Sequence, residues 1–280
     1  MRMLPNHMPP QSIEIPAFTY HQFVRTWNET LRGGYIQQLR SVGEETFLLK
    51  IHTREKNVQL LIALPSILIE STHAHALAEE QPGFVNATKK WLDNPKIEKI
   101  EQKGMDRVLM FTCDTIHIVF ELFGEGNIVI TDTSNTILAV LHGREWKGRS
   151  LKRGVPYILP QSLVSWENIS IPTEEQNETS SSTKTIESWL QFTLNVPPGL
   201  VEKIIKSAHV EKTPLIKMDE KMVEKIRHAL EKESNTPYEE FAALSTSRGE
   251  IIIPFAFDGE KKENIFSYLE EKVLARQNQK

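Results

Sequence analysis

The sequence contains a single cysteine, Cys113, among its 280 residues. One cysteine excludes an internal disulfide and any metal site built from several thiolates. No apolar run approaches the roughly 18 residues that a membrane-spanning helix needs. The first residues, MRMLPNHMPPQS, lack the apolar core of a secretory signal. These absences predict a cytoplasmic protein that does not interact with a membrane.

The sequence also lacks the short motifs of several common enzyme classes. It has no G-x-G-x-x-G turn, no phosphate-binding loop with its lysine and no G-x-S-x-G nucleophile elbow. His73 and His75 would share one face of a strand and could bind a metal, but no H-E-x-x-H motif or cysteine accompanies them. A structural role is the simpler interpretation of the pair. Cys113, within an apolar segment, is typical of a small buried hydrophobe, and we expect no metal, no cofactor and no catalytic residue.

The charge is nearly balanced, with a formal net charge of −4 that argues weakly against nucleic-acid binding. The balance is uneven along the chain. Residues 1–160 hold 18 Lys+Arg against 17 Asp+Glu, whereas the remainder holds 15 against 20. Local clusters of charge determine binding more than this total does.

The first part of the chain has the pattern of one helix followed by short strands. Apolar residues at helical spacing predict a helix over 18–34, ended by two glycines, and a second, short helix over 84–94. Apolar runs separated by turn residues predict the strands 35–42, 46–53, 58–65, 67–72, 96–104, 107–113, 115–123, 127–133 and 136–142. HIVFELF, within 115–123, is apolar almost throughout and predicts a strand buried on both faces. Close spacing without a βαβ alternation favours a sandwich or barrel-like meander.

The composition changes after residue 160. Residues 161–183 are polar and acidic, which is typical of a linker or a mobile loop. Apolar spacings of three and four then predict the helices 184–195, 198–210, 219–233, 236–244 and 263–280, with one strand or hairpin over 249–257. The predicted fold class is α+β, with a strand-rich domain over 1–160, a linker over 161–183 and a small helical domain over 184–280.

A basic cluster, REWKGRSLKR, occupies residues 144–153. It holds five positive charges against Glu145 and one aromatic ring, Trp146; the cations are Arg144, Lys147, Arg149, Lys152 and Arg153. Glycines in and around the segment predict a loop. A basic loop with an aromatic residue could bind phosphate and stack on a base, but a solvated loop explains the same composition.

The segment QKGMDRVLMF, residues 102–111, places opposite charges at the start of an apolar strand. One interpretation has Asp106 closing a turn after Gly104 and Arg107 pairing with a neighbouring strand. The other has Arg107 presenting its planar guanidinium to a phosphate or base edge while Asp106 orients it. From the residues alone the structural interpretation is favoured.

Four segments, in order, resemble the N-terminal domain of the NFACT family of ribosome-associated quality-control factors, also described as fibronectin-binding protein A-like. They are LRGGYIQQL, IEQKGMDRVLMF, IVFELFGEGNIVITD and RSLKRGVPYILP. Residues 192–230 resemble the helix-hairpin-helix or helix-two-turn-helix segment that follows this domain in the family. The resemblance covers nearly the whole chain.

The resemblance implies a fold similar to the N-terminal domain of formamidopyrimidine-type DNA glycosylases. It also implies binding to tRNA and to the rRNA of a stalled large ribosomal subunit, in support of template-free addition of residues to the nascent chain. Asp106 and Arg107 match the motif implicated in that tRNA-dependent activity, and Glu121 matches a second motif position with a larger departure. The RNA contact of the basic cluster is inferred from charge alone.

Two departures from known patterns shape the expectations. Glycosylases use an N-terminal proline and an adjacent glutamate, whereas this chain begins Met1-Arg2-Met3, so glycosylase activity is not expected. Family members continue into a coiled coil that would begin near residue 280, so we expect a truncated chain. The alternatives to an RNA-binding module are a nucleic-acid-processing enzyme related to DNA glycosylases and a protein-interaction scaffold.

Overall fold

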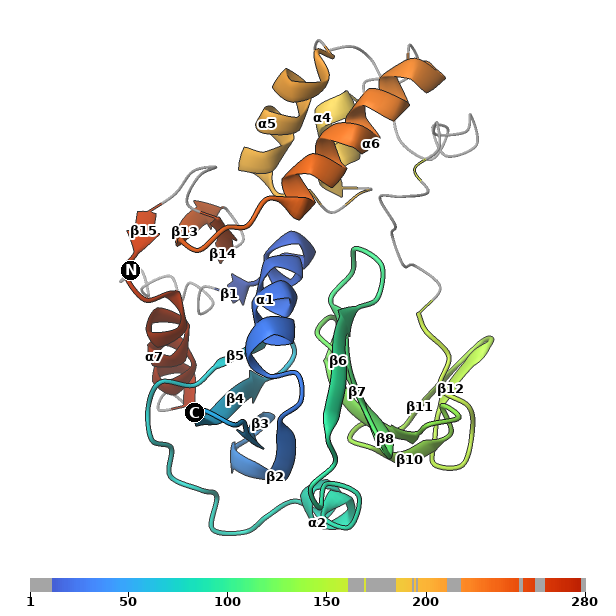
Figure 1. Cartoon of the computed structure of the whole chain (residues 1–280), viewed down its shortest axis with the longest axis vertical. Helices are drawn as coiled ribbons and strands as arrows, with labels where there is room; N and C mark the ends of the chain where they lie inside the picture. The colour runs from blue at the N-terminus through green and yellow to red at the C-terminus, as the bar shows by residue number, and fades with distance from the viewer. Residues whose placement is uncertain are drawn as a thin grey trace, which may run out of the picture.

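The computed structural model describes residues 12–160, 169, 185–192, 194, 196–210, 218–246, 249–254 and 260–277. It has the predicted α+β class, with strand-rich sheets in the first part of the chain and a group of helices after it (Figure 1). Apart from Ile169, the predicted linker over 161–183 lies outside the described residues. No helix in the described part of the chain is long and apolar enough to cross a membrane.

The helix α1, Ala17–Thr30, lies between two antiparallel sheets. The first sheet is a four-stranded meander of β2 (Tyr35–Gly43), β3 (Thr46–His52), β4 (Asn57–Ala63) and β5 (Ile67–Glu70). The Tyr20 hydroxyl donates to the carbonyl of Ser66 over 2.8 Å, and Asn28 accepts from the backbone N–H of Ile100 over 2.9 Å. The helix therefore joins the first sheet to the second through polar contacts as well as packing.

The second sheet follows the short helix α2, Gly83–Thr88, and has five strands in the order β10-β9-β8-β7-β6. Their bounds are β6 Ile97–Gln102, β7 Val108–Cys113, β8 Ile116–Glu121, β9 Asn127–Asp132 and β10 Ile137–Val140. Leu109, Phe111 and Phe120 belong to the large core around α1, whereas Val108 and Val119 belong to a smaller cluster on the opposite face. The prediction that HIVFELF forms a strand buried on both faces is confirmed.

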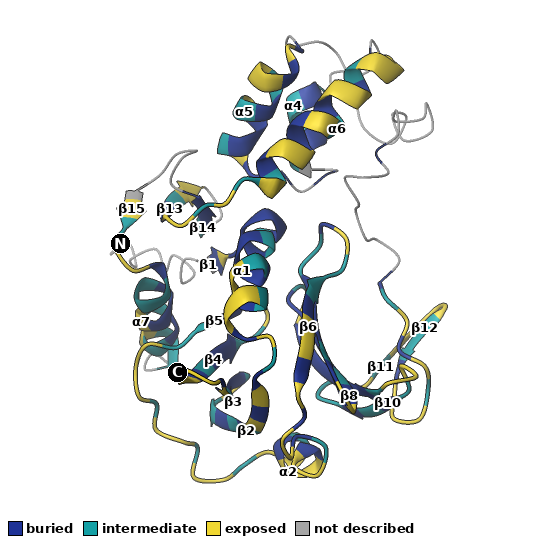
Figure 2. Ribbon diagram, in the orientation of Figure 1, coloured by how far each residue is buried: buried dark blue, intermediate teal, exposed yellow. Residues whose placement is uncertain are grey.

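The hairpin β11–β12 covers the smaller cluster. Its strands are Arg144–Trp146 and Arg149–Leu151, paired antiparallel. The segment was predicted to be a loop, and this prediction is wrong, because only Lys147 and Gly148 form the turn and Gly148 adopts the φ of 87° that a tight turn requires. Leu151 is fully buried and anchors the hairpin. Figure 2 shows exposed residues at the turn of the hairpin.

Three helices, α4 (Ile186–Phe192), α5 (Pro198–Ala208) and α6 (Glu220–Asn235), form a second core. The Asp219 carboxylate caps α6 by accepting from the backbone N–H of Met222 over 2.7 Å. Two residues of the strand-rich part, Phe18 and Met105, are buried in the same core. The helical group is therefore attached directly to α1 and to the β6–β7 turn.

The predicted helix 236–244 is wrong, because Phe241–Thr246 forms strand β13. It pairs with β14 (Gly249–Pro254) and β15 (Glu260–Lys262), and β1 (Ser12–Glu14) joins β14 in parallel. Apolar residues spaced by three and four suit a helix, but pairing with the isoleucines of β14 buries Phe241, Ala242 and Ala243 together. Tertiary pairing outweighs local spacing here.

The apolar residues of the predicted domain over 184–280 divide between two cores. Phe241 and Ile252 belong to the large core, as do Leu269 and Val273 of the last helix α7, Ile265–Gln277. Among the helices described after residue 160, only α4, α5 and α6 form the separate helical group. The last helix thus returns to the strand-rich part, and its end at Gln277 lies next to Gly43 of β2 (Figure 1).

Candidate nucleic-acid interface

A buried carboxylate lies beneath the hairpin. Glu121, the last residue of β8, is 4% exposed. One of its oxygens, Oε1, accepts a 2.8 Å hydrogen bond from the Tyr157 hydroxyl and forms an ion pair with Nη2 of Arg149. Burial and the Glu121 charge raise the pKa of Tyr157, so its hydroxyl remains a donor. Arg149 also donates from Nε to the carbonyl of Ile158 over 2.7 Å, which holds its guanidinium in place.

The fixed guanidinium lies against two aromatic rings. The Cζ atom of Arg149 is 5.4 Å from the ring centre of Trp146 and 5.5 Å from that of Tyr157. Trp146 is 47% exposed, an unusually open position for a large aromatic side chain. A hollow of about 390 Å³ adjoins the Trp146 ring and is lined by residues that include Glu121, Phe123, Glu125, Arg144, Trp146, Lys147 and Arg149. The structure therefore brings together four of the predicted site residues.

Carboxylates neutralise three of the five cations in the basic cluster. Arg144 pairs with Glu125, Arg149 with Glu121, and Lys152 with Glu145. Lys147 and Arg153 are exposed and form no ion pair with any described residue. The cluster is consequently less basic toward a ligand than its sequence suggests, and Lys147 is its free cation beside the hollow.

The Asp106-Arg107 pair lies in the β6–β7 turn. Asp106 Oδ1 accepts from the backbone N–H of Arg107 over 2.7 Å, so this carboxylate closes the turn. The guanidinium of Arg107 instead pairs with Glu14 of β1, Nη1 to Oε1 at 2.9 Å. The interpretation in which Asp106 orients the guanidinium is corrected: the strand β1, far away in the sequence, supplies the partner. The Arg107 side chain remains 25% exposed.

The two predicted motifs lie at one end of the second sheet but on opposite faces. Val108 pairs in register with Glu121, and the backbone N–H of Leu122 donates to the carbonyl of Arg107 over 2.8 Å. Successive side chains of a strand alternate between faces. Glu121 therefore points with Val108 toward the hairpin, whereas Arg107 points toward α1 and β1. Arg107 and the hairpin do not form one continuous patch.

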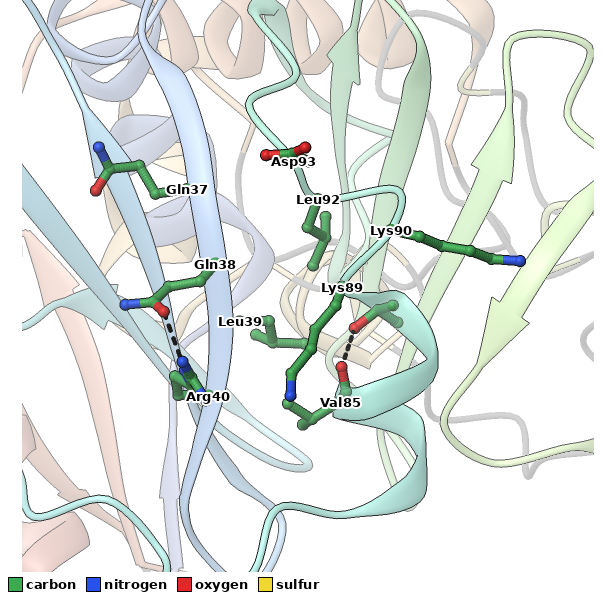
Figure 3. A pocket seen from close by; sticks show the side chains of 10 residues that line it. Gln37, Gln38, Leu39, Arg40, Val85, Lys89, Lys90, Leu92 and Asp93 are labelled. Atoms are coloured by element: carbon green, nitrogen blue, oxygen red, sulfur yellow. Dashed lines mark hydrogen bonds between the residues drawn. The ribbon is translucent and has the colours of Figure 1, made fainter.

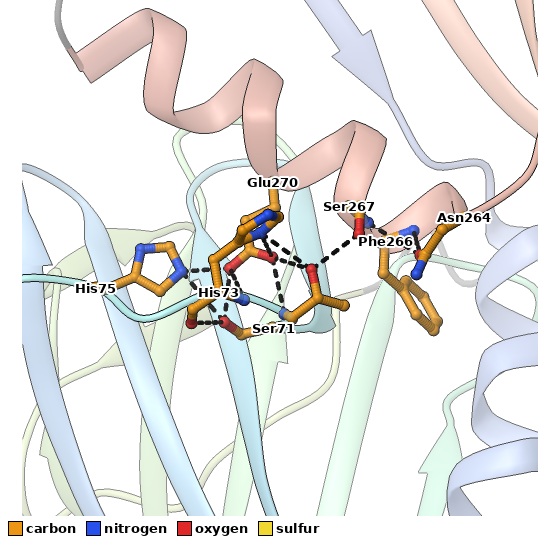
Figure 4. A network of polar contacts seen from close by, with 8 residues as sticks. Ser71, His73, His75, Asn264, Phe266, Ser267 and Glu270 are labelled. Carbon is orange, nitrogen blue, oxygen red and sulfur yellow. Dashed lines mark hydrogen bonds and ion pairs between the residues drawn. The ribbon is translucent and has the colours of Figure 1, made fainter.

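The two histidines considered as metal ligands have another partner. Nδ1 of His73 lies 2.8 Å from Oε2 of Glu270 in α7, and Nε2 of His75 contacts Oε1 of the same carboxylate (Figure 4). The described residues contain no group of three side chains suited to a metal ion. Cys113 is buried, and burial with the nearby charges of Asp114 and Glu98 raises its pKa to about 12. Its thiol is therefore not an activated nucleophile.

Residues 17–272 match the family model described as NFACT N-terminal and middle domains. The chain belongs to the NFACT family. Among its relatives, the archaeal Rqc2 homolog aRqcH of Methanocaldococcus jannaschii is 32% identical over 120 residues, which cover 40% of this chain and 18% of the relative. The Rqc2 homolog RqcH of Bacillus subtilis is 29% identical over 136 residues, which cover 43% of this chain and 23% of the relative. These matches span less than a quarter of each relative.

Solved structures show the same fold at low sequence identity. The N-terminal part of the fibronectin/fibrinogen-binding protein of Streptococcus suis superposes with a TM-score of 0.69 at 18% identity, covering 93% of this chain and 99% of that chain. The fibrinogen binding protein of Staphylococcus aureus gives 0.63 at 17% identity, covering 91% and 97%. The arrangement of sheets and helices is therefore shared with these two proteins.

Within this NFACT chain, reasoning from the sequence missed the groups that hold the two arginines. Glu14, Tyr157 and the carbonyl of Ile158 were not predicted. The motif YILP at 157–160 carried only the resemblance, and nothing in the segment itself indicated that Tyr157 would donate to Glu121. Glu14 carries no local signal, because β1 and Arg107 meet only through the fold.

Proposed function

We propose that this NFACT chain is a cytoplasmic RNA-binding module of ribosome quality control that contacts tRNA and the rRNA of the large ribosomal subunit. It acts by binding and has no turnover of its own. Its relatives are named as Rqc2, RqcH and NEMF proteins of ribosome quality control, which supports the biological setting. Support for template-free tailing of nascent chains is proposed for the longer protein of which such a module is part.

The observation that carries the proposal is the pairing of exposed Trp146 with the fixed guanidinium of Arg149. A base stacked on an exposed aromatic ring is worth about 1–3 kcal/mol and needs no particular sequence. Lys147, at the adjacent turn, can contact a backbone phosphate. Because Arg149 is already held by Glu121 and Ile158, little side-chain entropy is lost when a ligand binds.

Glu121 has an indirect role in this proposal. Its carboxylate is buried and already accepts from Tyr157 and Arg149, so it orients the guanidinium rather than contacting RNA. Arg107, on the opposite face, is a second candidate contact because its side chain is partly exposed. We further propose that the helices α5 and α6 correspond to a helix-hairpin-helix or helix-two-turn-helix unit and that the strand-rich part resembles the glycosylase N-terminal fold.

Fluorescence anisotropy with labelled tRNA tests this function. The variants Trp146→Ala and Lys147→Glu should each weaken binding by roughly 5- to 100-fold at 0.1 M salt, as expected for one stacked base or one phosphate contact. The matched control is Lys56→Glu, which makes the same charge change at the exposed β3–β4 turn. Equal affinities for all four proteins would exclude the hairpin as the RNA contact, and absence of binding by the unmodified chain would refute the function.

A further inference from the structure

A second hollow lies between β2 and the segment that follows α2 (Figure 3). Its volume is about 430 Å³, and its lining includes Gln38, Arg40, Thr88, Lys89, Leu92 and Asp93. Leu39, Val85 and Leu92 are buried and fix the two walls against the large core. Both walls of the hollow therefore pack on the large core, and the hollow lies apart from both the hairpin and the β6–β7 turn.

Two cations of the hollow come from different walls. Arg40 extends from β2, and Lys89 extends from the end of α2 toward the level of Arg40 (Figure 3). Lys90 points away and lies 4.1 Å from the ring centre of Trp91. Asp93, the one acidic residue lining the hollow, lies at the far end from Arg40 in the same view. The positive end of the hollow thus faces no carboxylate of the lining.

Neither cation is neutralised within the described residues. No ion pair joins Arg40 or Lys89 to an aspartate or glutamate there, in contrast to the three neutralised cations of the hairpin segment. Arg40 donates from Nε to Oε1 of Gln38 over 3.0 Å, a contact that orients the guanidinium and leaves its two terminal NH₂ groups for another acceptor. The amide of Gln38 still has its own NH₂ group to donate.

We propose that this hollow binds a phosphodiester of the RNA backbone. An oriented guanidinium can contact two phosphate oxygens at once, and a lysine ammonium adds a mobile point charge. Cavities of about 300–1,000 Å³ accommodate small molecules, so a phosphate with its adjoining sugar fits. The inference rests on the proposed RNA-binding function. It adds an RNA contact on a third part of the surface, and the family resemblance gives no RNA-binding role to Arg40 or Lys89.

The test compares two double variants with the same loss of charge. Arg40→Gln with Lys89→Gln removes the cations of the hollow, and Arg54→Gln with Lys56→Gln removes the same residue types from the exposed β3–β4 turn. Binding to labelled tRNA is measured from 0.05 to 0.3 M salt. Loss of two phosphate contacts should lower the slope of log K against log salt by about 1.4–1.8, and the affinity by on the order of 10- to 50-fold at 0.1 M salt. The double variant at the β3–β4 turn should change the salt slope and the affinity much less.

The possible outcomes separate this inference from the function on which it rests. If the unmodified chain binds tRNA and both double variants lose the same affinity, the hollow is not a specific contact and the inference is overturned. If the unmodified chain does not bind, the proposed function fails first. Titration with inorganic phosphate at constant ionic strength forms the second arm. Tight phosphate binding that requires Arg40 and Lys89, without an effect on tRNA affinity, would also overturn the assignment to RNA.

Discussion

Replacing Glu270 by glutamine should loosen α7 from the loop that follows β5. The Glu270 side chain is fully buried, and donors from that loop surround both of its oxygens (Figure 4). Oε2 accepts from the Thr72 backbone N–H at 2.8 Å and the Thr72 hydroxyl at 2.7 Å, and it lies 2.8 Å from Nδ1 of His73. Oε1 accepts from the Ser71 hydroxyl at 2.6 Å. One carboxylate thus interacts with donors from three consecutive residues, and His75 also contacts it.

The size of the stability loss depends on which hydrogen bonds of the carboxylate a glutamine side chain can still make. Its carbonyl oxygen can occupy one carboxylate position, and its amide NH₂ must occupy the other, where the carboxylate accepts hydrogen bonds. With the carbonyl oxygen facing the Thr72 N–H, the Ser71 hydroxyl can turn to accept from the NH₂, so part of the network survives. Hydrogen bonds to a charged group contribute about 1.5–3 kcal/mol each. We therefore expect Glu270→Gln to lower the free energy of unfolding by about 2–3 kcal/mol at pH 7.

The same network makes the effect depend on pH. Burial opposes ionisation of Glu270, but hydrogen bonds from Ser71, His73 and Thr72 outweigh it and lower its pKa to about 2. An unfolded glutamate titrates near pH 4.5, so the stabilisation is complete above that pH and is lost as the pH falls from 4.5 toward 2. The stability difference between the unmodified chain and Glu270→Gln should therefore shrink over this interval.

Urea unfolding at pH 7, 4 and 3 measures this difference. The matched control is Glu271→Gln, which removes the same charge from the next, exposed residue of α7 and should change stability by less than about 0.5 kcal/mol. A stability difference for Glu270→Gln that stays the same from pH 7 to pH 3 would refute the assignment of a low pKa to the folded state. A negligible stability difference at pH 7 would refute the conclusion that Glu270 holds α7 to the loop after β5.

The other predictions concern the candidate interface and its core. Arg107→Ala should weaken tRNA binding and change stability by at most about 1 kcal/mol, since its partner Glu14 is half exposed; unchanged tRNA affinity with lower stability would return Arg107 to a structural role. Glu14→Ala should leave tRNA binding intact or strengthen it, because the guanidinium is released. Glu121→Gln should lower stability by about 3 kcal/mol in urea unfolding, because it leaves Arg149 buried without a counter-charge; a neutral effect would contradict the buried pair. Cys113 should react with a thiol reagent at pH 8 only after unfolding, and rapid labelling of the native chain would contradict its burial.

Strand positions could be predicted from the sequence where the pattern and the environment agree. In β3, β4 and β7, runs of large apolar residues end at turn residues, and the fold places them in consecutive antiparallel pairs. The strand β13 shows the opposite case. Its alanines favour a helix locally, and only its position between β14 and β15 makes it a strand. That information lies in distant residues and not in the segment.

The site was predictable in composition but not in geometry. The sequence identified the basic residues of 144–153, yet charge alone could not show that Glu121 and Glu125, on and just after β8, would neutralise two of them. A hairpin was missed because glycine and charge dominate the segment, whereas the buried Leu151 that anchors it is one residue among ten. Partners of charged side chains depend on contacts between distant segments, which local patterns do not encode.

The separation of Arg107 from the hairpin constrains how a ligand could use both. The two sites lie at the same end of β7 and β8 but on opposite faces of the sheet. Met105, two residues before Arg107, is buried in the core of α4, α5 and α6, so one wall beside Arg107 belongs to the helical group. A flat ligand surface cannot touch Arg107 and Trp146 together, whereas a strand of RNA that curves around the sheet end can. If one RNA contacts both, variants at the two sites should weaken its binding additively, because they share no side-chain partner.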